Sequence, residues 1–135
     1  MRVFLDTNVL VSAFASRGLC ADVFELVLFE HDLIVGRNVL RELDKALRQK
    51  IRLPALSAAE VVDFVANEAT LVVDGAGPAP VKADAADSRV LGEALAGRAE
   101  SFVTGDAALL RLANIGALEI VSPRRFWDAL RAGNG

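Results

Sequence analysis

The sequence has 135 residues, of which 53% are hydrophobic, and this size fits one compact domain over residues 1–135 that needs no disulfides. Its net charge of −3 and pI near 5.1 differ from the basic surplus that is typical of a dedicated nucleic-acid-binding domain. The only cysteine, Cys20, excludes an internal disulfide and fits a cytoplasmic protein, and no charge-free apolar stretch approaches the ~18 residues of a membrane span.

The first half of the chain is predicted to alternate short apolar strands with helices. Its predicted elements are a strand at 2–6, a helix from Thr7, a helix at 19–30, a strand at 32–35 and a helix at 37–52. The apolar residues of helix 19–30 occupy more than one face, so we expect this helix to be deeply buried or shared with a partner. The first strand closes on Asp6, a carboxylate that would be costly to bury without a partner or an ion.

The second half continues the same alternation. Its predicted elements are a helix at 57–68, a strand at 71–73, a Gly/Pro-rich loop at 74–83, a helix at 84–96, a strand at 101–104, a short helix at 106–114, a strand at 118–121 and a final helix that starts at Ser122-Pro123. Ser57 and Glu60 have the spacing of a capping box. Strands that alternate with helices predict an α/β fold whose parallel sheet is covered on both faces.

Four carboxylates stand where such a sheet would bring them together. Asp6 ends the first strand, and Asp106 follows the fourth. Glu42 lies one turn into the helix after the second strand, and Asp87 lies in the first turn of the helix before the fourth, so both can reach the same edge. Like charges at this spacing repel one another, and a divalent cation removes the conflict. Carboxylate oxygens without His or thiolate suit Mg²⁺ or Mn²⁺, and the chemistry that follows is phosphodiester hydrolysis by metal-activated water.

Three of these carboxylates also have ordinary structural explanations. Asp87, preceded by Asp84, and Asp106 stand at helix starts, where the helix dipole favours a carboxylate. Glu42 fits an ordinary surface residue as well. For Asp6 the metal site is the better explanation.

A basic stripe runs along the predicted helix that carries Glu42. At about 100° per residue, five basic side chains fall on one face: Arg37, Arg41, Lys45, Arg48 and Arg52. A basic ridge beside an acidic metal site predicts a track for a phosphate backbone, carried by Arg37, Arg41, Lys45 and Arg48. A solvated helix face whose cations pair with neighbouring acids explains the stripe equally well.

Four short motifs, in this order and spacing, resemble the PIN-domain ribonucleases, in particular the VapC-like toxins of prokaryotic toxin–antitoxin systems. They are LDTNVL, RELDKAL, ADAADSRVLGEAL and FVTGDAALL, and together they extend over nearly the whole chain. The resemblance implies that the metal-binding and catalytic acids are Asp6, Glu42, Asp87 and Asp106. It further matches Asn8 and Thr104 to polar positions beside the first and last of these acids, and Asp84 to an accessory acid.

The resemblance also implies a fold and partners. The expected fold is a three-layer α/β/α sandwich around a central five-stranded parallel sheet. The expected activity is Mg²⁺- or Mn²⁺-dependent cleavage of RNA by a homodimer that a small antitoxin neutralises.

Two other function classes remain open at this point. One is a binding module for RNA or protein, in which the acids are only helix caps and helix 19–30 docks a partner. The other is an aspartate-based phosphatase or receiver-like domain, which also places an Asp after its first strand. Against the latter, Asn8 stands where the phosphatase needs a second Asp, and no Lys follows Lys82.

Overall fold

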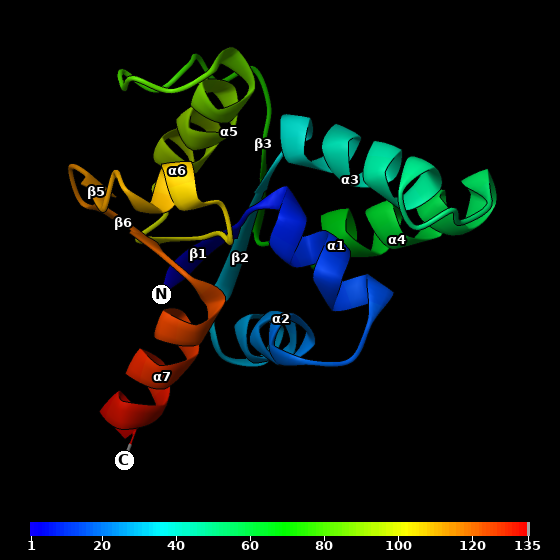
Figure 1. Cartoon of the computed structure of the whole chain (residues 1–135), viewed down its shortest axis with the longest axis horizontal. Helices are drawn as coiled ribbons and strands as arrows, with labels where there is room; N and C mark the ends of the chain where they lie inside the picture. Colours follow the sequence, from blue (N-terminus) through cyan, green and yellow to red (C-terminus); the bar gives the residue numbers. More distant parts are fainter. Residues whose placement is uncertain (135) are drawn as a thin grey trace.

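A computed structural model describes residues 1–134 and contains one sheet with helices packed on both faces (Figure 1). The strands are β1 (Arg2–Leu5), β2 (Asp32–Gly36), β3 (Leu71–Val73), β4 (Ser101–Val103), β5 (Asn114–Ile115) and β6 (Leu118–Val121). The helices are α1 (Thr7–Ala15), α2 (Leu19–Glu30), α3 (Arg37–Gln49), α4 (Ala55–Glu68), α5 (Ala85–Ala96), α6 (Ala107–Leu110) and α7 (Pro123–Asn134).

The strand order is β3-β2-β1-β4-β6-β5, and every neighbouring pair except β5 and β6 is parallel. The predicted five-stranded parallel sheet is therefore confirmed, and the two-residue β5 is an antiparallel addition at its edge. After β1 the chain continues to β2 and β3 on one side of the sheet, and after β4 it continues to β5 and β6 on the other side. The order thus reverses between β1 and β4, and the carboxyl ends of these two strands form the crevice where open α/β sheets bind ligands.

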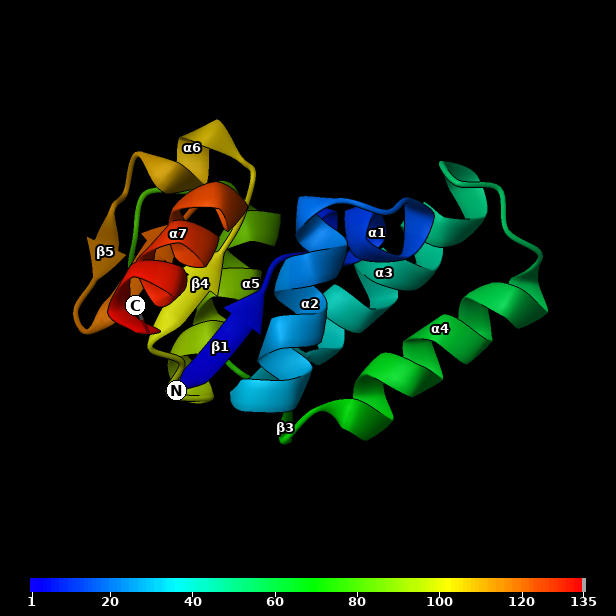
Figure 2. The ribbon, with the colours of Figure 1, turned by 90° about the horizontal axis from the view of Figure 1, so that it is seen from below.

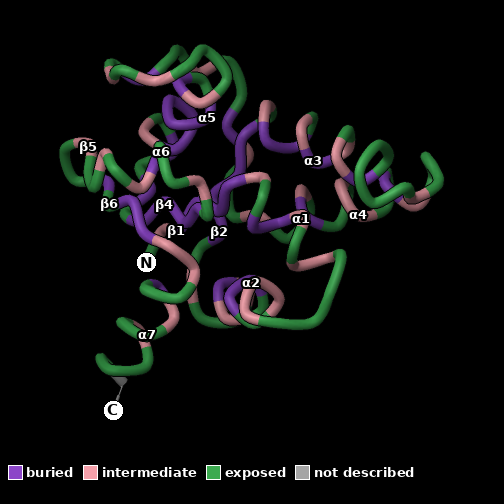
Figure 3. The backbone as a smooth tube through the Cα atoms, viewed as in Figure 1, coloured by how far each residue is buried: buried purple, intermediate pink, exposed green. Residues whose placement is uncertain are grey.

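The centre of the sheet is the core of the molecule. Burial is concentrated in β1, β2 and β4 (Figure 3), and Phe4 and Phe102 stack across the β1–β4 pair with ring centroids 5.3 Å apart. Helix α5 covers one face, whereas α2 and α7 cover the other (Figure 2). Helix α2 is buried on one side only, because Val23 and Val27 face the core while Phe29 is 80% exposed.

Three predicted boundaries were wrong, each for a local reason. Helix α3 ends at Gln49, and the chain turns away at Arg52, whose φ is +64°. Helix α4 starts at Ala55 with Pro54 in the capping position, so no capping box forms at Ser57. Helix α6 has only four residues, because the chain turns at Ala113, with φ of +62°, into β5.

The Gly/Pro-rich loop at 74–83 is fixed against α5. Ser88 donates its hydroxyl to the carbonyl of Ala79 at 3.1 Å and accepts that residue's N–H through its own carbonyl at 2.8 Å. Gly92 permits this contact, because a Cβ there would lie 1.9 Å from the carbonyl oxygen of Gly77. The loop therefore holds the helix whose first turn carries Asp87.

Candidate functional site

Asp6 lies directly after β1 and caps the N-terminus of α1. Its Oδ1 accepts the backbone N–H of Thr7 at 2.8 Å, and its Oδ2 accepts the hydroxyl of Thr104 at 2.7 Å. The residue is only 8% exposed. The end of β1 thus presents a buried carboxylate whose orientation is set by the first residue of α1 and by the residue that follows β4.

Thr104 and Asn8 connect this carboxylate to the segment after β4. The fully buried Thr104 hydroxyl also accepts the backbone N–H of Asp106 at 3.0 Å. The Asn8 amide lies 3.4 Å from both Asp6 Oδ2 and Thr104 Oγ1, and its oxygen accepts the N–H of Gly105 at 3.2 Å. These polar residues, both predicted as accessory positions, tie the two strand ends into one network.

The other three predicted acids reach the same cleft from separate elements. Glu42 comes from the second turn of α3 and accepts the Thr7 hydroxyl at 3.2 Å. Asp87 lies in the first turn of α5, and Asp106 caps α6. A cleft of about 370 Å³ is lined by Asp6, Thr7, Asn8, Val11, Ser12, Glu42, Ala46, Lys50, Asp87 and Asp106. The structure therefore brings together all four acids that the sequence singled out.

The electrostatics of the cleft disfavour a full set of negative charges. Burial is the main cause that raises the pKa of Asp6, and the Thr104 hydroxyl and Thr7 N–H oppose it. Burial likewise raises the pKa of Glu42. Burial, followed by the charges of Asp84, Asp106 and Asp6, raises the pKa of Asp87 to about 6. A bound cation would remove this repulsion and favour the ionised forms.

The donor set suits Mg²⁺ or Mn²⁺, because the cleft offers carboxylate, hydroxyl and amide oxygens and is lined by no His or Cys. As the side chains of residues 1–134 are placed, no three Asp, Glu, His or Cys groups stand close enough to hold one ion together. Glu42 and Asp87 are both only partly buried and face the open cleft.

Asp84, predicted as an accessory acid, stands outside the cleft. It caps α5 by accepting the N–H of Asp87 at 2.8 Å and is exposed. Its charge contributes to the raised pKa of Asp87, which is the structural effect it has on the site.

The predicted RNA-binding residues on α3 divide between two grooves. Arg37, Arg41 and Arg48 line a groove of about 660 Å³ between α3 and α4. There Arg37 lies 3.7 Å from Asp74, and Arg48 lies 2.9 Å from Asp44. Lys45 instead lines a smaller hollow beside the acidic cleft. Only part of the basic stripe thus borders the candidate site.

Sequence reasoning missed Glu93. This residue is 1% exposed, and its Oε2 accepts the backbone N–H of Asn38 at 2.9 Å and its side-chain amide at 3.3 Å. Oε1 has no hydrogen-bond partner within residues 1–134, and a Cβ at Gly36 would lie 2.1 Å from it. Glu93 thus joins α5, which carries Asp87, to the start of α3, which carries Glu42. A charged residue beside the buried Val90, Leu91 and Ala94 of a helix was the available signal.

Thr7 and Lys50 were also missed, and both line the cleft. Thr7 directly follows Asp6, and Lys50 stands two helical turns after Glu42 on the same face of α3, so each had a positional signal.

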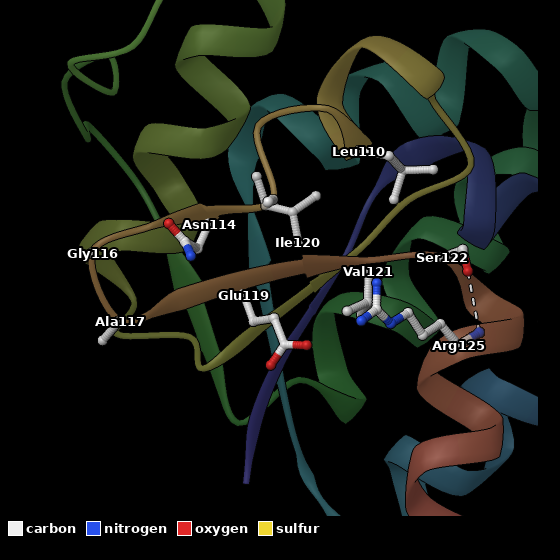
Figure 4. Close-up of a pocket in the computed structure, with 10 residues that line it drawn as sticks. Leu110, Asn114, Gly116, Ala117, Glu119, Ile120, Val121, Ser122 and Arg125 are labelled. Atoms are coloured by element: carbon white, nitrogen blue, oxygen red, sulfur yellow. Dashed lines mark hydrogen bonds between the residues drawn. The ribbon is translucent and has the colours of Figure 1, made fainter.

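A second and larger hollow, of about 580 Å³, lies beside β6 and the start of α7 (Figure 4). Its charged lining residues are Glu119 and Arg125, and Figure 4 shows Arg125 alongside Val121, with its backbone bonded to the Ser122 hydroxyl. None of the predicted site residues lines it. The acidic cleft, although smaller, is therefore the better candidate site because it concentrates titratable groups with raised pKa values.

Comparisons with known proteins concern the family and the fold. Residues 2–108 match the family described as PIN domain. The fold is similar to a chain in the crystal structure of VapBC2 from Rickettsia felis bound to a DNA fragment from their promoter. The TM-score is 0.64 at 17% sequence identity, over 90% of this chain and 98% of that chain. No curated protein sequence matches. Within residues 1–134, no helix is long and apolar enough to cross a membrane.

Proposed function

Because the chain belongs to the PIN domain family, we propose that it is an endoribonuclease that hydrolyses RNA phosphodiester bonds with Mg²⁺ or Mn²⁺ at the acidic cleft. The observation that carries this proposal is the convergence of Asp6, Glu42, Asp87 and Asp106, from four separate elements, on one cleft at the reversal point of the sheet. Three of these acids, Asp6, Glu42 and Asp87, have raised pKa values in the cleft, which supports a cationic ligand.

When bound, a divalent cation would supply an activated water and would stabilise the charge that develops on the phosphate oxygens. The chain's residues would hold and orient the carboxylates. Thr104 and the Thr7 N–H fix the two oxygens of Asp6, and the Thr7 hydroxyl orients Glu42. Burial and the neighbouring carboxylates raise the pKa of Asp87 to about 6, so below that pH Asp87 would have to lose a proton to act as a ligand.

We further propose that the chain is the toxin of a toxin–antitoxin pair, that it forms a homodimer in the cytoplasm, and that a small antitoxin protein binds it. The structural likeness to a VapBC2 complex supports this proposal. The exposed Phe29 on α2 supports the presence of a protein partner.

A second candidate function is a non-catalytic module of the same fold that binds RNA or protein. The observation that favours it is that no three acids within residues 1–134 are already placed to hold one ion. The two candidate functions differ in one observable: a metal-dependent enzyme cleaves RNA when Mn²⁺ is added, and a binding module does not.

The test is incubation of the purified protein with a mixed RNA pool, with and without Mn²⁺, beside the Asp6→Asn variant. We expect cleavage only with Mn²⁺, and a loss of more than about 100-fold in Asp6→Asn, since loss of a metal ligand should exceed the 10–100-fold effect typical of its outer partners. Circular dichroism checks that the variant is folded. Intact RNA in every lane would refute the enzyme and leave the binding module.

A further inference from the structure

The acidic cleft continues into a second hollow along the seam between α1 and α3. The second hollow, of about 260 Å³, is lined by Thr7, Glu42, Lys45, Ala46, Gln49 and Lys50. Four of these residues, namely Thr7, Glu42, Ala46 and Lys50, also line the acidic cleft. The two hollows therefore form one groove, here named the α1/α3 groove.

Charge changes sign along the α1/α3 groove. Asp6, Asp87 and Asp106 line only the acidic cleft, Lys45 lines only the second hollow, and Glu42 and Lys50 line both. A groove that combines acids and lysines in this way suits a ligand with several phosphates. One phosphate would bind a metal ion at the acids, and others would bind the lysines.

The two lysines are free to bind such a ligand. Both are exposed, and neither side chain forms an ion pair or a hydrogen bond with the rest of residues 1–134. By contrast, Arg37 and Arg48 in the α3–α4 groove are paired with Asp74 and Asp44. An anion that binds those arginines must compete with the carboxylates already there.

Spacing indicates the size of the ligand. With a rise of 1.5 Å per residue, Lys45 lies about 4.5 Å and Lys50 about 12 Å beyond Glu42 along the helix axis. Lys50 lines both hollows and Lys45 lines only the second, and a polynucleotide repeats its phosphates along a groove of this length. No aromatic residue lines the groove, so it lacks the platforms on which proteins stack bases. The groove therefore suits the backbone of the strand.

We propose that the α1/α3 groove holds the sugar–phosphate backbone of single-stranded RNA on one side of the cleaved bond, with Lys45 and Lys50 as its phosphate-binding residues. This inference rests on the proposed function for the choice of RNA. It assigns the backbone to the lysine end of the stripe, and not to Arg37, Arg41 and Arg48.

The test measures binding of a fluorescent, unstructured single-stranded RNA by anisotropy at several salt concentrations with Mn²⁺. All variants carry Asp6→Asn so that the probe is not consumed. Lys45→Gln with Lys50→Gln is compared with Arg41→Gln with Arg48→Gln, which removes the same charge from the same helix. Replacement of both lysines with Arg keeps the charge and checks that structure is unaffected.

We expect the lysine pair to weaken binding about tenfold near 0.1 M salt and to reduce the salt slope by about 1.4, since each single-strand phosphate contact contributes about 0.7. The arginine pair should change binding by less than about twofold, and the Lys→Arg pair should bind as the parent. An equal or larger loss in the arginine pair, or no binding of RNA at all, would overturn the inference. Lysine-dependent binding by a protein that never cleaves RNA would refute the proposed enzyme and leave this inference intact.

Discussion

Thr104 is the residue that joins the end of β1 to the segment after β4. Its hydroxyl donates to Asp6 Oδ2 at 2.7 Å and accepts the N–H of Asp106 at 3.0 Å, in full burial. One side chain thus orients a proposed ligand and fixes the backbone of another. Its importance is indirect, since it would act through the carboxylates.

Replacement of Thr104 with Val keeps the shape and removes both hydrogen bonds. We expect a 10–100-fold loss in Mn²⁺ affinity or activity, as is typical when the partner of a metal ligand is removed, and destabilisation of about 1–3 kcal/mol from the unpaired buried groups. Mn²⁺ titration and urea unfolding measure the two effects. Thr104→Ser retains the hydroxyl and should stay close to the parent in Mn²⁺ affinity and in stability. Wild-type behaviour of Thr104→Val would show that the hydroxyl does not support the site.

Asp87 makes the metal-free protein sensitive to pH. Its pKa is raised from 3.8 to about 6 in the fold, so the folded state binds more protons than the unfolded chain between these values. The contribution of Asp87 to stability is therefore present below about pH 4 and is lost as the pH rises through about 6. A cation that favours the ionised form should reverse this loss.

We accordingly expect Mn²⁺ to raise the melting temperature more at about pH 7.5 than at about pH 5, because protons compete with the ion below the pKa of Asp87. Differential scanning calorimetry with and without Mn²⁺ measures this difference. In Asp87→Asn the pH dependence of the Mn²⁺ effect should shrink. An equal Mn²⁺ effect at both pH values in the wild type would contradict the role of Asp87.

At the scale of elements, Glu93 sets how α5 and α3 meet. Its carboxylate accepts hydrogen bonds from the backbone N–H and the side-chain amide of Asn38 at the start of α3. Gly36 has no Cβ and leaves the space that this carboxylate fills. Since α3 carries Glu42 and α5 carries Asp87, this contact fixes the separation between two sides of the cleft.

Replacement of Glu93 with Leu should destabilise the fold by about 1–3 kcal/mol, because the part-buried N–H of Asn38 loses its acceptor. Glu93→Gln keeps an acceptor oxygen and removes a carboxyl whose pKa burial raises, so it should unfold at the same urea concentration as the parent or at a higher one. If Leu and Gln behave alike, the hydrogen bond is not what Glu93 contributes.

Local patterns predicted the strands and most helices because apolar runs and turn residues are read within one segment. The start of α4 at Ala55 was not predicted, because Pro54 takes the capping position in place of Ser57. The short length of α6 was not predicted, because the chain turns at Ala113, whose φ is positive. Glu93 escaped for a different reason. Its partner Asn38 is 55 residues away in the sequence, and nothing local indicates such a pair.

At the scale of the whole molecule, topology explains why the four acids could be predicted and the basic stripe could not. Asp6 and Asp106 follow strand ends, and Asp87 and Glu42 lie in the first and second turns of helices at the same edge, so the reversal between β1 and β4 brings all four to one cleft. The basic stripe on α3 is divided by α4. Val62, Asp63 and Ala66 of α4 form one wall of the α3–α4 groove, which Arg37, Arg41 and Arg48 line. A helical projection contains no information on where a neighbouring helix packs.

The central claim is that Asp6, Glu42, Asp87 and Asp106 form one divalent-metal site. The most direct measurement is an anomalous difference map from crystals of the protein soaked in Mn²⁺. We expect a manganese peak in the cleft between these carboxylates, and we expect the Asp6→Asn substitution to remove this peak. An empty cleft at a Mn²⁺ concentration that supports RNA cleavage, or a peak only elsewhere on the protein, would contradict it.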